Sequence, residues 1–129
     1  MLFHKFASQE ERRAYGGSAF VEIQFCRLLT GTPHEEIVSA GSIEHWDNDS
    51  LYVDDERRFY SEYSGILDCG IYNDMNIGTV DIFGINYYAP PVIETIIERL
   101  RKERPVDHET FIEWLTEAQK YNGFYILGI

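Results

Sequence analysis

The last third of the sequence places two amphipathic helix patterns in front of a short apolar segment, and this order limits the folds open to the chain. After Pro90 and Pro91, which suit the first turn of a helix, apolar residues recur at helical spacing over residues 93–100. A second helix is expected after the cap residue Asp107. Its buried side is formed by Phe111, Ile112, Trp114, Leu115 and Ala118. Residues 124–129 are apolar enough to predict a strand inside a sheet rather than at its edge.

Helical spacing also occurs in the N-terminal quarter. Ser8 begins a capping-box pattern, which predicts a short helix that Gly16 and Gly17 interrupt. From Ser18 the apolar residues again recur at helical spacing, and the predicted second helix ends at Gly31. The residues on its apolar side are Phe20, Val21, Phe25, Leu28 and Leu29.

Strand patterns dominate the middle of the chain. Residues 51–53 predict a short strand, and residues 65–72 and 79–88 predict two longer strands joined by a turn in an antiparallel hairpin. Residues 34–46 are ambiguous, with a short strand as one interpretation. Residues 54–58 fit a turn or a single helical turn.

Together these patterns predict an α+β protein. We expect an antiparallel sheet of about four to five strands packed with helices. The 129 residues fit one domain, and 44% of them are hydrophobic, which supplies a core. The expected organisation is a single acidic α+β domain over residues 1–129.

The sequence contains no signal for export or for membrane insertion. Cys26 and Cys69 are too few for a disulfide framework, and neither belongs to a CxxC pair. The N-terminal residues become charged before an apolar signal segment can form, and no stretch approaches the ~20 apolar residues of a membrane span. We therefore expect a cytoplasmic protein with reduced thiols and no membrane contact.

Acidic residues are concentrated in the middle of the chain. Overall, 22 acids against 11 bases give a net charge of −11, while residues 28–98 hold fourteen acids and only two bases, Arg57 and Arg58. Such a segment repels a phosphate backbone, which argues against binding to DNA or RNA. Charge can serve solubility alone, but its uneven distribution favours a basic partner.

No set of residues predicts catalysis. The sequence lacks the glycine-rich loops that hold phosphate groups. The segment that starts at His34 begins like a zinc-protease helix but lacks the second histidine. The segment that starts at Asp47 resembles a calcium loop but has Tyr52 in place of the required glycine. We expect no metal, no cofactor and no enzymatic activity.

Tyrosines are interleaved with acids in this middle segment. Four of the nine tyrosines, Tyr52, Tyr60, Tyr63 and Tyr72, lie among the acids of residues 47–74, and tyrosine is enriched at protein interfaces because it offers rigid area and a hydroxyl group. For any one of them alone, packing in the core is the better explanation. As a group they predict an acidic, aromatic face that binds a basic protein. The predicted partner-binding residues are Asp47, Asp49, Tyr52, Asp54, Asp55, Glu56, Tyr60, Glu62, Tyr63, Asp68, Tyr72 and Asp74.

The overall format resembles the immunity proteins of bacterial contact-dependent growth inhibition (CDI) systems, particularly those paired with ribonuclease toxins. The resemblance rests on the small size, the acidic middle, and the run from Pro90 through the Trp114 helix to residues 121–129. It implies a cytoplasmic antitoxin that binds its cognate toxin protein, a basic nuclease domain, and masks the nuclease active site.

Two other functions fit parts of the sequence. A small cytosolic hydrolase would use Asp68 with His45 or His108, and it requires a pocket where these groups converge. An acidic regulator that mimics nucleic acid toward another basic protein shares the charge argument with the immunity function. Only the identity of the partner separates those last two functions.

Overall fold

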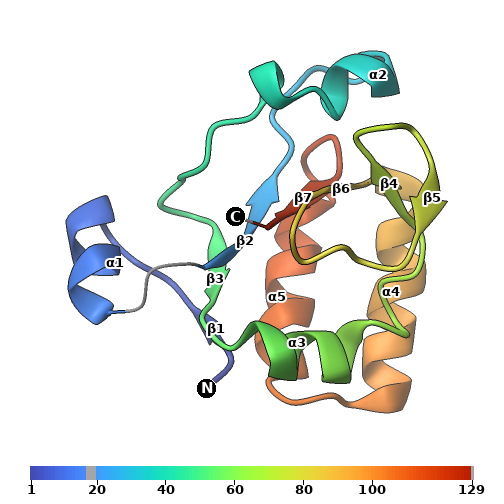
Figure 1. Cartoon of the computed structure of the whole chain (residues 1–129). Coiled ribbons are helices and arrows are strands. Elements are labelled where there is room, and N and C mark those ends of the chain that lie inside the picture. Colours follow the sequence, from blue (N-terminus) through green and yellow to red (C-terminus); the bar gives the residue numbers. More distant parts are fainter. Residues whose placement is uncertain (17–19, 129) are drawn as a thin grey trace.

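An antiparallel sheet lies at the centre of the protein in the computed structural model, which describes residues 1–16 and 20–128 (Figure 1). Within these residues it has seven strands in the order β1-β3-β2-β7-β6-β4-β5, and all neighbours are antiparallel. The predicted α+β class is confirmed, and the sheet has more strands than expected. The strands are β1 (Phe3–His4), β2 (Val21–Phe25), β3 (Leu51–Val53), β4 (Gly70–Tyr72), β5 (Ile77–Gly78), β6 (Ile85–Tyr88) and β7 (Phe124–Leu127).

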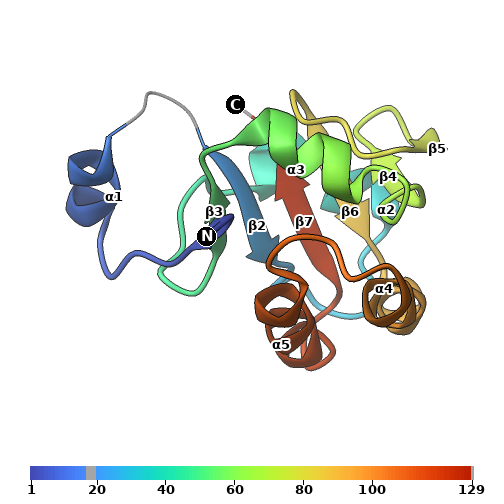
Figure 2. The same ribbon diagram turned by 90° about the horizontal axis from the view of Figure 1, so that it is seen from below.

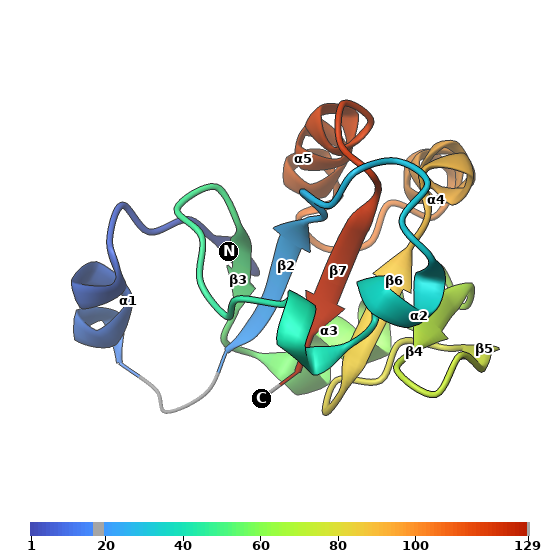
Figure 3. The same cartoon turned by 90° about the horizontal axis from the view of Figure 1, so that it is seen from above.

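Helices cover both faces of the sheet. In Figure 1, α2 lies above the sheet and α3, α4 and α5 lie below it, and Figures 2 and 3 show these two sides in turn. Helix α1 extends to one side of the sheet, and none of its residues is buried. The helices are α1 (Gln9–Tyr15), α2 (His34–Ile37), α3 (Glu56–Tyr63), α4 (Pro90–Glu103) and α5 (His108–Ala118), with a 3₁₀ turn at Ala40–Ser42.

The central strand β7 is buried on both faces. Because successive side chains of a strand point to opposite faces, Phe124 and Ile126 pack in the cluster that contains the apolar sides of α4 and α5. Tyr125 and Leu127 pack in a second cluster with Ile37 of α2. The prediction of an interior strand is therefore confirmed. Ile129, which the prediction included, lies outside the described residues.

The two C-terminal helices have the predicted positions and buried sides. Pro90 and Pro91 form the start of α4, and Ile93 and Leu100 belong to its buried stripe. Helix α5 follows Asp107, which is left-handed (φ 60°) and accepts a hydrogen bond from the Thr110 hydroxyl at 2.8 Å. None of the described helices combines the length and the apolar character needed to cross a bilayer.

The predicted helix over residues 18–31 is wrong, because residues 21–25 form strand β2. Val21, Ile23 and Phe25 face α4 and α5, whereas Glu22 and Gln24 point to the opposite face. All five residues of the strand are buried. The strand therefore lacks the solvent-exposed polar side that alternates with the apolar side in a half-buried strand. Ser18, the predicted start of the helix, and Gly17 lie outside the described residues.

The middle of the chain has shorter strands than predicted. Only residues 70–72 of the 65–72 segment form a strand, and only residues 85–88 of the 79–88 segment do. The hairpin partner of β4 after the turn is β5, and β6 pairs with the other edge of β4. The ambiguous residues 34–46 contain α2 and the 3₁₀ turn rather than a strand.

Candidate functional site

Two of the four predicted tyrosines are core residues. Tyr52 and Tyr63 are both fully buried. The Tyr52 hydroxyl donates to the carbonyl oxygen of Asp47 at 2.7 Å, and the Tyr63 hydroxyl donates to that of Val106 at 2.6 Å. Burial raises the pKa of both phenols. Neither side chain is therefore available to a partner in this structure.

The predicted acids are distributed over several parts of the surface, and several have partners within the chain. Arg27 binds both Asp47 and Asp49 beside β2, and Arg99 of α4 binds Asp68 at 2.6 Å. Asp54 accepts a hydrogen bond from His4 at 3.1 Å.

Three further acids stabilise local structure. Asp55 caps α3, because its carboxylate accepts a hydrogen bond from the amide of Arg58 at 3.1 Å. Glu62 accepts a hydrogen bond from the amide of Val106 at 2.8 Å, and Asp74 accepts one from that of Asn76 at 3.0 Å. Glu56 is half-buried in the first turn of α3. The twelve predicted residues therefore do not form one continuous face.

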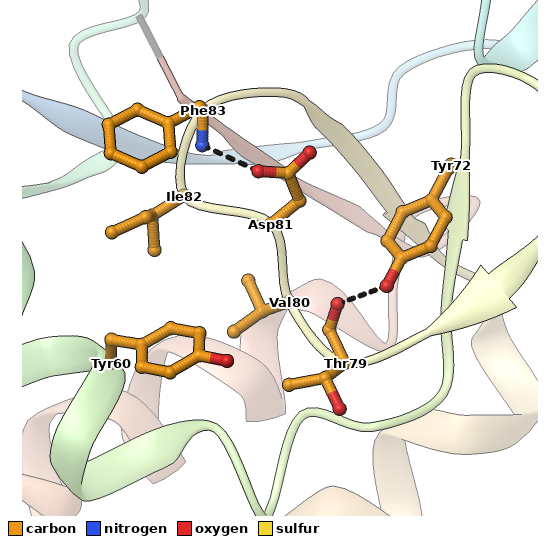
Figure 4. Close-up of a pocket in the computed structure, with 7 residues that line it drawn as sticks. All are labelled: Tyr60, Tyr72, Thr79, Val80, Asp81, Ile82 and Phe83. Atoms are coloured by element: carbon orange, nitrogen blue, oxygen red, sulfur yellow. Dashed lines mark hydrogen bonds between the residues drawn. The ribbon is translucent and has the colours of Figure 1, made fainter.

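Tyr60 and Tyr72 do come together, at a groove between α3 and the loop that follows β5 (Figure 4). The groove has a volume of about 570 Å³. We call it the α3–loop groove. It is lined by Tyr60, Tyr72, Thr79, Val80, Asp81, Ile82 and Phe83.

Helix α3 supplies one wall of the α3–loop groove. Phe59 and Tyr63 lie one helical turn apart and are buried against the core, so the intervening Tyr60 points outward and is 43% exposed. Figure 4 shows its ring facing the loop residues Val80 and Ile82 across the hollow.

Buried hydrogen bonds hold the loop that forms the other wall. The amide of Val80 donates to the carbonyl oxygen of Leu67 at 2.9 Å, and the Val80 side chain is buried. The side chain of buried Asn86 accepts from the amide of Asp81 and donates to the Asp81 carbonyl oxygen, both at 2.8 Å. The loop is therefore fixed at both its start and its middle before any partner binds.

A tight turn carries Phe83 out to the surface. The Asp81 carboxylate accepts a hydrogen bond from the amide of Phe83 at 2.9 Å, and the amide of Gly84 donates to the Asp81 carbonyl oxygen at 3.3 Å. Phe83 is consequently 71% exposed, an unusual position for a phenylalanine.

Tyr72 lies across strand β5 at the far end of the groove. Its hydroxyl donates to the carbonyl oxygen of Thr79, as Figure 4 shows. A Cβ atom at Gly78 would meet the Tyr72 ring at 3.0 Å, so glycine leaves the space that the ring occupies. The small size of Gly78 thus determines where this wall of the groove lies.

Exposed apolar residues are frequent in the segment of the chain that contains the groove residues. Among the described residues, four of the seven large hydrophobic side chains that are exposed fall between residues 60 and 83. These four are Tyr60, Met75, Ile77 and Phe83. Residues 59–98 contain six acids and no lysine or arginine. The lining of the groove therefore combines aromatic side chains with one acid, Asp81.

Phe83, Asp81 and Ile77 were not among the predicted site residues. The segment 79–88 was interpreted as one strand, which hides the exposed turn between its two ends. The signal that identifies the turn is Asp81 followed three residues later by Gly84, a spacing typical of type I turns.

The groups proposed for a hydrolase do not contact one another. Asp68 pairs with Arg99, while the His108 ring lies 3.1 Å from the carbonyl oxygen of Pro105. No hydrogen bond or ion pair joins Asp68 to His45 or His108, all of which are described residues. Within residues 1–16 and 20–128, no three His, Cys, Asp or Glu side chains are arranged to hold a metal ion.

A buried acid lies on the upper face of the sheet. Glu22 is 2% exposed, and its Oε2 atom accepts hydrogen bonds from Gln24, Ser50 and the amide of Asp47, with the Tyr52 hydroxyl oxygen 3.2 Å away. Burial raises the pKa of Glu22, and the hydrogen bonds oppose that rise. Because a substrate cannot reach the carboxylate, its evident role is to hold residues 47–52 against β2.

The α3–loop groove is the described surface feature best suited to binding another molecule. It offers exposed aromatic area on rigid backbone, and exposed apolar clusters of this kind typically mark interaction sites. No family model matches the sequence, and no curated protein or solved structure similar to the chain was found.

Proposed function

We propose that this protein is an immunity protein that acts in the bacterial cytoplasm, where it binds and neutralises a cognate nuclease toxin. In this proposal the protein has no catalytic activity and works by covering the basic active-site cleft of the toxin, which is a ribonuclease. The observation that carries the proposal is the α3–loop groove, whose lining includes the exposed aromatic residues Tyr60 and Phe83 and, as its one charged residue, Asp81.

The aromatic part of this surface supports tight binding. Most of the affinity of a protein interface comes from a few large side chains, and exposed Tyr60 and Phe83 are the strongest candidates. Because the loop and α3 are held by internal hydrogen bonds, little conformational entropy is lost when a partner binds.

The acidic part supports recognition of a nuclease. A nuclease needs basic side chains to hold phosphate groups, so its active site attracts a protein with a net charge of −11. Electrostatic attraction of this kind raises association rates by about 10–10³-fold at low salt. Rapid capture suits an antitoxin, because free toxin damages the cell until it is bound.

Several acids of the middle segment contribute less to this attraction than the sequence implies. Arg27 neutralises part of the charge of Asp47 and Asp49, and Arg99 does the same for Asp68. The proposed interface is therefore centred on the α3–loop groove, with Asp74 and Asp81 as exposed acids that have no basic partner among the described residues.

Co-expression tests the proposal. The toxin domain encoded next to this chain is produced in bacteria with and without the protein, and growth and complex formation are measured. We expect growth to be restored and the two proteins to co-purify as a stable complex, with binding that weakens as salt rises. Failure of both rescue and co-purification with every adjacent toxin domain overturns the proposal. Co-purification with an unrelated basic protein supports the regulator function instead.

A further inference from the structure

We infer that the α3–loop groove receives an arginine side chain of the partner. The inference rests on the proposed function for the identity of that partner, but the chemistry of the groove can be tested without it. Three properties of the lining carry the inference, namely aromatic rings, an aliphatic floor and a carboxylate that forms no ion pair with a described residue of the chain.

The walls match the two parts of an arginine side chain. Val80 and Ile82 form an aliphatic surface against which the methylene stem can pack. Tyr60 and Phe83 offer aromatic faces at the open side, where a planar guanidinium stacks with a favourable cation–π interaction. Figure 4 shows these four side chains around one hollow.

The charge of the groove selects a cation. Asp81 is exposed and is the only charged residue in the lining. Its Oδ1 atom accepts the hydrogen bond from the Phe83 amide, and a carboxylate has the capacity to accept several more. An apolar side chain would fill the walls but would leave this carboxylate without a counter-charge.

Arginine fits the lining better than lysine does. An ammonium group is compact and strongly hydrated, so it loses more hydration when it is placed between rings. The guanidinium is flat, weakly hydrated and able to stack and to donate hydrogen bonds at the same time. A nuclease that holds phosphate groups has arginines of this kind on the surface that the proposed function places here.

The groove is already formed in the free chain. Tyr72 bonds to Thr79, Val80 bonds to Leu67, and Asn86 holds Asp81. A preformed site loses less entropy on binding, so one side chain inserted here contributes strongly to affinity. A side chain of this kind would be the central anchor of the interface.

The first experiment uses small probes and does not require the toxin. The full-length protein is labelled with ¹⁵N and titrated by NMR with N-acetyl-arginine amide, N-acetyl-lysine amide and N-acetyl-leucine amide at equal concentrations. We expect the arginine probe to produce the largest amide shifts, centred on Tyr60, Thr79 and Phe83, and Asp81→Asn to reduce them. Equal or larger shifts with the lysine or leucine probe at these amides overturn the inference, as does the absence of shifts there.

The second experiment uses the complex with the toxin domain. Phe83→Ala and Asp81→Asn are each expected to weaken binding about tenfold or more, a loss of about 1.4 kcal/mol. Leu29→Ala is the matched control, because Leu29 is 83% exposed, apolar and outside the groove. We expect this control to bind within about twofold of the original protein. Circular dichroism verifies that all three variants fold.

The outcomes separate the two proposals. If the original protein binds the toxin and Phe83→Ala binds equally well, the arginine site is wrong and the immunity function stands. If the original protein does not bind any adjacent toxin, the immunity function fails, and the NMR titration alone decides whether the groove takes an arginine side chain.

Discussion

The Ser50 hydroxyl donates a hydrogen bond of 2.7 Å to the buried carboxylate of Glu22, and neither side chain is accessible to solvent. Gln24 and the amide of Asp47 bind the same oxygen atom at 3.2 and 3.1 Å. A buried charge is costly unless it is fully hydrogen-bonded. Glu22 therefore links β2 firmly to the loop before β3, and it also makes the stability of the protein sensitive to pH.

We predict that ionisation of the Glu22 carboxyl group lowers the stability of the fold at neutral pH and that this cost fades in mild acid. Burial raises the pKa of Glu22 in the folded chain above its ordinary value of 4.5, so the folded state binds the proton more tightly than the unfolded state. The cost is present above the folded pKa and disappears as the pH falls through that pKa toward 4.5. Chemical denaturation of the original protein and of Glu22→Gln, repeated from pH 7 to pH 4.5, measures the difference. Parallel stability curves for the two proteins contradict the prediction.

Removal of a single donor to this carboxylate is predicted to be costly. Ser50→Ala deletes the hydroxyl and leaves the charge with fewer partners, so we expect the free energy of unfolding to fall by about 1.5–3 kcal/mol at pH 7. Ser61→Ala is the matched control, because Ser61 is exposed on α3. Urea denaturation of both variants tests the prediction. An equal decrease in the free energy of unfolding for the two variants would mean that the hydrogen bond from Ser50 to Glu22 does not stabilise the fold.

The cluster also explains why β2 was not predicted from the sequence. The apolar residues from Phe20 to Leu29 recur at helical spacing, and that pattern gives no sign that the polar side chains of Glu22 and Gln24 are buried. In the structure both side chains are buried in a polar cluster, so the strand has no exposed side. Sequence patterns predict amphipathic elements such as α4 and α5 well, because each has one solvent-exposed side and one buried side. A strand buried on both faces lacks that contrast.

The same limit applies to the predicted binding residues. The sequence could not separate Tyr60 and Tyr72, which line the α3–loop groove, from the buried Tyr52 and Tyr63, since burial depends on the tertiary packing of each element. The spacing of Phe59 and Tyr63 on α3 contains that information once the helix boundaries are known. The pairing of Arg27 with Asp47 joins residues twenty positions apart, and no local pattern predicts such contacts.

The two cysteines are predicted to react at different rates. Cys26 is fully buried, whereas Cys69 is partly exposed. Burial raises the pKa of both thiols, and the neighbouring charge of Asp68 raises that of Cys69 further, so both should react slowly at neutral pH. In a native-state assay with Ellman's reagent we expect one slow equivalent, from Cys69, and a second only after unfolding. The assay is repeated on Cys69→Ser, and rapid release of an equivalent from that variant contradicts the assignment.

Gly123 is predicted to tolerate substitution poorly, because its backbone is left-handed (φ 83°) and a Cβ atom there would collide with the carbonyl oxygen of Tyr88. A shift of the turn that relieves this collision would break the hydrogen bond of 3.0 Å that the Gly123 carbonyl oxygen accepts from the amide of Cys26. We expect Gly123→Ala to lower the free energy of unfolding by about 1–3 kcal/mol. Gly65→Ala is the control, because a Cβ atom at Gly65 meets nothing within 4 Å, and it should change stability by less than about 0.5 kcal/mol. Thermal and urea denaturation compare the two variants, and similar stability for both would mean that the turn before β7 adapts more easily than its hydrogen bonds imply.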